Sequence, residues 1–152
     1  MVTVNLIGND ELKRKFNGLS DKLQGNLIKK ALVKAAQPIR DEAKREAPIA
    51  SRDVVLKRKG KDKVTIARGN LKKSIKIFRG KNKKWLNVQV GAATKGRFNG
   101  FYAHFVSEGH KTRSGGKTKE NPFMKRAADR KEKEAVEIFR KEFNTILEQN
   151  FR

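Results

Sequence analysis

Apolar residues recur at steps of three and four along the N-terminal third of the chain, at Leu12, Phe16, Leu19, Leu23, Leu27, Ala31, Ala35, Ile39, Ala43 and Ala47. This spacing predicts one helical stripe of about 35 residues, roughly 50 Å long at 1.5 Å per residue. Pro38 lacks a backbone N–H, so we expect the helix to kink or split near it. The step from Ala47 to Pro48 predicts its end, because the residue before a proline avoids the helical region.

The middle of the chain changes to a strand-like pattern. Residues 75–79 alternate roughly between apolar and polar, residues 80–83 resemble a turn, and residues 85–90 alternate cleanly. This arrangement predicts an antiparallel β-hairpin with one buried face. Residues 101–106 form another apolar unit, which is too short for periodicity to distinguish a strand from a helix.

The C-terminal region predicts a second long helix. Asn121 is placed to cap it, Pro122 suits the first helical position, and apolar residues follow at helical spacing: Phe123, Ala127, Val136, Phe139, Phe143, Ile146 and Leu147. The expected fold class is therefore α+β, with a long N-terminal helix, a small antiparallel sheet and a C-terminal helix. A length of 152 residues suits a single domain, residues 1–152.

Two polar segments interrupt these elements. Residues 49–68 carry many lysines and few apolar side chains, which predicts a basic exposed loop or hairpin arm. Residues 109–120 are polar and glycine-rich, which predicts a second loop.

Charge is concentrated in the centre of the chain. Lysine and arginine total 38 against 16 acidic residues, for a net charge of +22, and residues 52–97 alone carry +14. A chain this basic is expected to work beside nucleic acid, an acidic protein surface or anionic lipid. The candidate contacts to DNA or an acidic partner lie in the arm: Lys57, Arg58, Lys59, Lys61 and Lys63.

Composition excludes several classes of protein. The chain has no cysteine, which rules out a disulfide scaffold, thiolate zinc sites and a cysteine nucleophile. No apolar run approaches the roughly 20 residues of a membrane span. The N-terminus lacks the features of a secretion signal, so we expect a soluble intracellular protein without membrane contact.

Catalytic and metal-binding patterns are weak. His104 and Glu108 would share a helix face and are the only metal-like pair, although a packed or solvated histidine is the better interpretation. Ser74, Ser107 and Ser114 have no histidine-plus-acid partners nearby in sequence, and no glycine-rich phosphate-binding motif occurs. We therefore expect no enzyme activity, no catalytic or metal site and no cofactor.

The basic segment leaves two interpretations open, phosphate contact and docking on an acidic protein. Thirteen basic residues between positions 57 and 84 could follow a phosphate backbone through counterion release. No motif for sequence-specific readout is visible. Phe98 and Phe101 could stack on bases, but core packing is the better interpretation.

Three segments together resemble a known family. Residues 31–48 contain Ala-Leu-x-x-Ala-Ala-x-Pro-Ile and end at Ala-Pro, residues 68–75 read Arg-Gly-Asn-Leu-Lys-Lys-Ser-Ile, and residues 102–109 read Tyr-Ala-His-Phe-Val-x-x-Gly before Asn-Pro-Phe at 121–123. This succession resembles the tail-completion (neck, or head–tail joining) proteins of long-tailed bacteriophages. The positions that carry the resemblance are Pro38, Pro48, Gly69, Leu71, Ser74, Ile75, Tyr102, Ala103, Gly109, Pro122 and Phe123.

The resemblance implies a structural virion protein whose motif residues shape the fold and the subunit contacts. Such a protein is expected to form a homo-oligomeric ring, with six subunits by analogy to related tail rings. It would meet the head-side stopper or connector and the tail terminator in the virion neck, beside packaged double-stranded DNA, after assembly in the host cytoplasm. The alanine-rich first helix is the candidate for packing between subunits. The alternative function is that of a nucleic-acid-binding protein without sequence specificity.

The sequence also departs from the family's usual pattern. Arg68 precedes Gly69 where the family usually has threonine, and Glu108 is displaced by one residue from the usual glutamate, so no specific salt bridge is assigned to it. Gly69 and Gly109 match the family, and glycine at such positions suits a backbone turn with positive φ.

Overall fold

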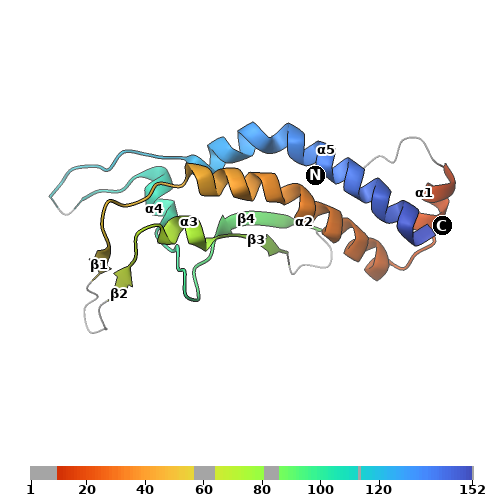
Figure 1. Cartoon of the computed structure of the whole chain (residues 1–152), viewed down its shortest axis with the longest axis horizontal. Helices are drawn as coiled ribbons and strands as arrows, with labels where there is room; N and C mark the ends of the chain where they lie inside the picture. Colours follow the sequence, from red (N-terminus) through yellow and green to blue (C-terminus); the bar gives the residue numbers. More distant parts are fainter. Residues whose placement is uncertain (1–9, 57–63, 81–85, 113, 152) are drawn as a thin grey trace.

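The computed structural model describes residues 10–56, 64–80, 86–112 and 114–151, and the mixed α+β class predicted above is confirmed. Figure 1 shows an elongated molecule built on two long helices. In chain order its elements are α1 (Asp10–Asn17), α2 (Asp21–Glu46), β1 (Val54–Leu56), β2 (Val64–Ile66), α3 (Asn70–Ser74), β3 (Ile75–Arg79), β4 (Val88–Ala92), α4 (Ala103–Glu108) and α5 (Phe123–Phe151).

Helix α2 is the middle of three layers. Its inner face packs along α5, and its other side contacts the β3–β4 hairpin (Figure 1). The C-terminal half of α2 meets the start of α5, while its N-terminal half meets the end of α5, so the two helices run antiparallel. At 1.5 Å per residue the helices are about 39 and 43 Å long, which sets the length of the molecule.

The predicted single N-terminal helix is in fact two helices. The chain leaves the helical path after Asn17, and Ser20 has the extended φ and ψ (−60° and 148°) of a residue preceding α2. The side-chain amide of Gln24 donates to the carbonyls of Phe16 (3.2 Å) and Leu19 (3.0 Å), which lets the end of α1 pair its carbonyls without continuing the helix. The apolar spacing could not reveal this break, because the steps of three and four continue across it from Phe16 to Leu19 and Leu23.

Helix α2 instead runs unbroken through Pro38 and ends at Glu46. A split at Pro38 is therefore wrong, because buried alanines on both sides of the proline, Ala35, Ala36 and Ala43, hold the helix against its neighbours. The predicted end at the Ala47–Pro48 step is confirmed, since Ala47 has extended φ and ψ of −62° and 125°.

Two hydrophobic clusters lie at opposite halves of the α2–α5 pair. The first contains the buried residues Ala43, Ala47, Leu71, Ile75, Phe123 and Ala127. The second contains Phe16, Leu27, Ala31, Phe143 and Leu147. In the second cluster Phe143 makes an edge contact with Phe16 (centroids 5.5 Å apart) and a stacked contact with Phe139 (5.7 Å).

The alanine stripe of α2 is used inside the chain. Ala31 and Ala43 are completely buried in the two clusters, where their small side chains allow close approach to the phenylalanines of α5. Packing of this helix between subunits stays a prediction, but its alanine face is already covered within the chain. Any contact with a neighbouring subunit through α2 has to use its other faces.

The described strands form two small antiparallel sheets rather than one. In the predicted hairpin, β3 pairs with β4 so that Ile75 lies opposite Ala92 and Ile77 opposite Val90. One face is buried, as predicted: Ile75 is fully buried, whereas Lys76 is exposed. Strand β4 begins at Val88, and residues 81–85 of the predicted turn and strand lie outside the described residues.

The basic segment contains the second sheet. Strands β1 and β2 pair from Val54 opposite Ile66 to Leu56 opposite Val64, and residues 57–63 between them lie outside the described residues, so a basic loop or hairpin arm over 49–68 stays a prediction. The apolar unit at 101–106 becomes helix α4, which resolves the choice between strand and helix. The loop at 109–120 contains one antiparallel bridge between Lys111 and Lys117.

Candidate interaction surfaces

Residues of all three motif segments meet in the first hydrophobic cluster. Leu71, Ile75 and Phe123 are buried there, and Tyr102 and Ala103 pack against them. Segments that lie far apart in the sequence therefore each supply apolar side chains to one core. Pro48 directly follows Ala47, the core residue that comes after the last residue of α2. Pro38 lies half-buried within α2.

A small polar centre lies beside this core. The side-chain amide of Asn70, which is only 8% exposed, donates to the carbonyl of Asn99 at 2.7 Å and to the hydroxyl of Tyr102 at 3.3 Å. The buried hydroxyl of Ser74 donates to the carbonyl of Leu71 at 2.7 Å. Sequence reasoning selected Ser74 and Tyr102 but missed Asn70, whose only signal is its place directly after Gly69 in the motif.

The start of α5 differs in detail from the prediction. Pro122 takes the capping position in place of Asn121, because its carbonyl accepts the N–H of Arg126 at 3.1 Å and the helix begins at Phe123. The side-chain oxygen of Asn121 instead accepts from Arg126 Nη2 at 2.7 Å. Both motif glycines, Gly69 and Gly109, have the expected positive φ, 73° and 71°.

An ion-pair cluster joins the end of α2 to the start of α5. Glu46 accepts from Arg126 Nε at 2.8 Å and pairs with Arg130, while Glu42 pairs with Arg45 at 2.6 Å and with Arg130 at 3.4 Å. A hydrogen bond from Arg45 lowers the pKa of Glu42, and one from Arg126 lowers the pKa of Glu46. Sequence analysis missed this cluster because the partners that pair across the two helices lie 80 to 88 residues apart in sequence.

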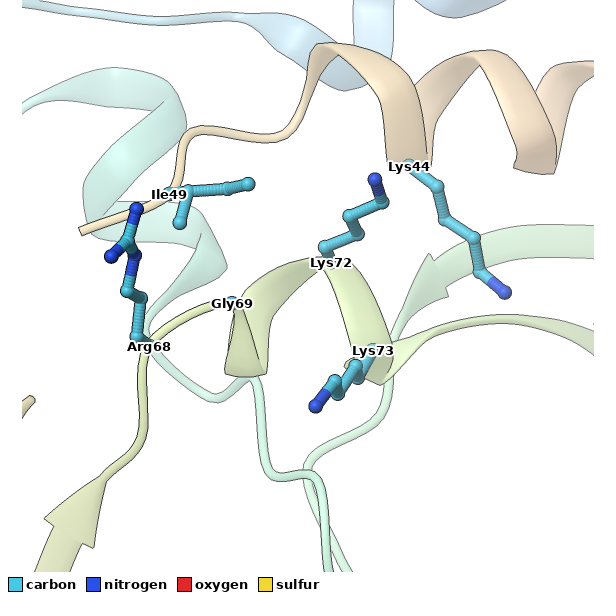
Figure 2. Close-up of a pocket in the computed structure, with 6 residues that line it drawn as sticks. All are labelled: Lys44, Ile49, Arg68, Gly69, Lys72 and Lys73. Atoms are coloured by element: carbon cyan, nitrogen blue, oxygen red, sulfur yellow. The ribbon is translucent and has the colours of Figure 1, made fainter. Parts of the chain in front are cut away.

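A cationic pocket lies between the end of α2 and the start of α3 (Figure 2). Its volume is about 500 Å³, and its lining consists of Lys44, Ile49, Arg68, Gly69, Lys72 and Lys73. In Figure 2 the side chain of Ile49 extends toward Lys72, and the guanidinium of Arg68 lies near its other end. The side chains of Lys44 and Lys73 point away from Ile49 (Figure 2). The lining therefore combines four cationic residues with one apolar side chain, and it contains no acidic residue.

The predicted contact residues of the arm lie outside the described residues: Lys57, Arg58, Lys59, Lys61 and Lys63. The described strands of this hairpin carry exposed apolar residues, with Val54 41% and Val55 53% exposed. The hairpin and the loop at 109–120 extend from the same end of the molecule, opposite α1 (Figure 1).

A comparison with protein families gives one match. Residues 10–109, about two thirds of the chain, match the HK97-gp10-like family, described as "Bacteriophage HK97-gp10, putative tail-component". The chain belongs to this family. No curated protein and no solved structure matches it. Membership in the HK97-gp10-like family supports the resemblance found in the sequence and the assignment to the tail of a bacteriophage virion.

The matched region of this HK97-gp10-like chain runs from α1 to the end of α4. It contains the polar centre, the cationic pocket and the motif residues up to Gly109, whereas Pro122 and Phe123 lie beyond it. None of the helices in the described part of the chain is long and apolar enough to cross a membrane.

His104 and Glu108, the two residues that the sequence offers as a possible pair of metal ligands, contact each other on the surface. His104 Nδ1 lies 3.2 Å from a carboxylate oxygen of Glu108, and both side chains are about two-thirds exposed. Within the described residues no group of three or more histidines or carboxylates is arranged to hold a metal ion. Phe98 and Phe101 are half-buried; Lys73 and Arg97 lie over the ring of Phe98, and Phe101 makes an edge contact with Tyr102.

Proposed function

We propose that this HK97-gp10-like protein is a ring subunit of the phage neck, where it joins the DNA-filled head to the tail. The observation that carries the proposal is the family match over residues 10–109. The succession of motif segments, which resembles that of tail-completion proteins, supports a place for this tail component in the neck. The role is structural rather than catalytic, with no cofactor.

The partners follow from the position in the neck. The subunit would contact further copies of itself within a ring, the head-side stopper or connector, and the tail terminator. The subunit is elongated, with the β1–β2 strands and the loop at 109–120 at one end and α1 at the other (Figure 1). Its two ends therefore offer separate surfaces to different neighbours. Leu23 on α2 and Val136 on α5 are 52% and 45% exposed, and they supply apolar contact area outside the internal cores.

The ring is proposed to contain six subunits and to assemble in the host cytoplasm before it becomes part of the virion. Native mass spectrometry of the purified protein, alone and mixed with head and tail preparations, measures the subunit number. A closed assembly other than six would overturn the hexamer while leaving the joining role open to the next test.

The joining role is tested by electron microscopy of lysates from a phage that lacks this gene. The controls are the intact phage and the deletion complemented with the gene on a plasmid. We expect full heads and finished tails that lie unjoined, with joining restored by complementation. Empty heads, or normal particles, would refute the proposal.

The net charge of +22 favours a second candidate, a nucleic-acid-binding protein without sequence specificity. A protein held on DNA mainly by phosphate contacts loses affinity by orders of magnitude between about 50 and 200 mM salt. Apolar contacts within a ring would persist over the same range. Titration of the purified protein with a DNA duplex at both salt concentrations, together with its oligomeric state, separates the two candidates.

A further inference from the structure

The lining of the cationic pocket between α2 and α3 contains no acidic residue, and the acids near it in sequence already accept hydrogen bonds. Asp41, one turn before Lys44, is held by Arg40 through two hydrogen bonds of 2.8 and 2.9 Å. Asp53 accepts the backbone N–H of Arg68 at 2.7 Å. Lys73 lies over the ring of Phe98, which leaves Lys44, Arg68 and Lys72 as the cations of this lining that an anionic partner would meet.

The pocket is also apolar at one point. Ile49 belongs to the same lining and is 52% exposed, so an apolar side chain is open to solvent beside these cations. An added Cβ on Gly69 would meet no atom within 4 Å, so the backbone borders open space. A space of about 500 Å³ is the size of a site for a few side chains of a partner.

We propose that this pocket binds an acidic peptide segment of a partner protein, with carboxylates on the lysines and Arg68 and an apolar side chain on Ile49. Double-stranded DNA presents charged phosphates on its backbone, which would satisfy the cations but leave Ile49 uncovered. A second copy of this chain is a poorer occupant of this pocket, because it has 16 acidic residues against 38 basic ones and no run of more than two consecutive acids. The proposal does not depend on where in the virion the protein acts.

The two parts of the pocket would serve different purposes. The cations attract the acidic segment and speed its encounter, and this contribution weakens as salt is added. The contact with Ile49 excludes water and depends little on salt. A partner with both features is thereby distinguished from a ligand that carries negative charge alone.

The test uses the full chain and two fluorescein-labelled peptides. In (Asp-Glu-Leu)₄ every third residue is apolar, and in (Asp-Glu-Ser)₄ serine replaces each leucine. Binding is followed by fluorescence anisotropy at 150 mM salt. The pocket variant is Arg68→Glu with Lys72→Glu, and the control variant is Lys125→Glu with Lys133→Glu on α5. All four side chains are exposed, so both variants lower the net charge equally without disturbing a core.

We expect the leucine peptide to bind the native protein about five- to tenfold more tightly than the serine peptide, since its apolar side chain covers Ile49. The pocket variant should weaken the leucine peptide at least tenfold, and the α5 variant no more than about twofold. Ile49→Ser should remove the preference for leucine while leaving the serine peptide unchanged. Because Ile49 is half-exposed, this variant is expected to fold normally, which circular dichroism checks.

A 24-base-pair DNA duplex is the competing probe. We expect the two double variants to reduce duplex binding equally, because phosphate contact follows overall charge. If the pocket variant selectively weakens the duplex and neither peptide depends on the pocket, the site is a phosphate contact and the proposal is wrong. Equal binding of the two peptides, or equal losses in the two double variants, would also overturn it.

Discussion

The polar centre at Asn70 gives the sharpest stability prediction. Asn70→Asp keeps the shape of the side chain but removes both donors, so at pH 7 a carboxylate oxygen would face the carbonyl of Asn99 across the present 2.7 Å contact. Leaving a buried acceptor unpaired costs about 1–3 kcal/mol, and more where a charge is involved. We therefore expect the free energy of unfolding to fall by about 3 kcal/mol, or the Tm by about 6–12 °C for a chain of this size.

The measurement is urea unfolding followed by far-ultraviolet circular dichroism. Tyr102→Phe is the matched control, because it removes only the longer 3.3 Å bond and should cost less than about 1 kcal/mol. Asn70→Ala should fall near the aspartate variant, which would show that the loss comes from the missing donors. An aspartate variant within 1 kcal/mol of the native protein, or a phenylalanine variant that costs as much, would refute the role given to Asn70.

Three further predictions follow from the described contacts. Phe123→Ala should destabilise the protein by about 3–5 kcal/mol, because the ring is fully buried in the first cluster; a loss below about 1.5 kcal/mol in the same urea assay would contradict that packing. Gly109→Ala should cost more than about 2 kcal/mol, since φ is positive and the added Cβ would lie 2.5 Å from a backbone carbonyl oxygen, whereas Gly115→Ala, with positive φ but open space, should cost about 1 kcal/mol. The lowered pKa values of Glu42 and Glu46 mean that their ion pairs stabilise the fold at neutral pH, and that this contribution is lost as pH falls through and below about 4.5. The double change to glutamine should therefore lower the Tm at pH 7 but make little difference at pH 3, and an equal effect at both values would disprove the linkage.

The sequence predicted the elements that have a clear period. Both long helices and the β3–β4 hairpin could be read from apolar spacing, because each buries one continuous face. Helix α3 could not, since five residues are too few to show a period and the helix runs directly into β3 at Ile75. The break before Ser20 also escaped prediction, because two helices in the same apolar register look like one.

The candidate surfaces were predicted less completely, for a different reason. Family resemblance selected Tyr102 and Ser74, but the role of Asn70 depends on partners 29 and 32 residues away. The cationic pocket likewise combines Lys44 and Ile49 with a segment that begins at Arg68. The sequence pattern indicates which residues are charged and which are buried. These sites, however, form only when the fold brings distant segments together.

Helix α5 has a consequence for how the chain reaches its native state. It supplies Phe123 and Ala127 to one cluster and Phe143 and Leu147 to the other, yet it is synthesised after every element that it covers. The face of α2 that packs on α5 therefore stays uncovered on the ribosome until α5 has emerged, and a transiently exposed apolar face favours aggregation. The interval between synthesis of α2 and of α5 is thus the stage of folding at which this chain is most exposed to aggregation.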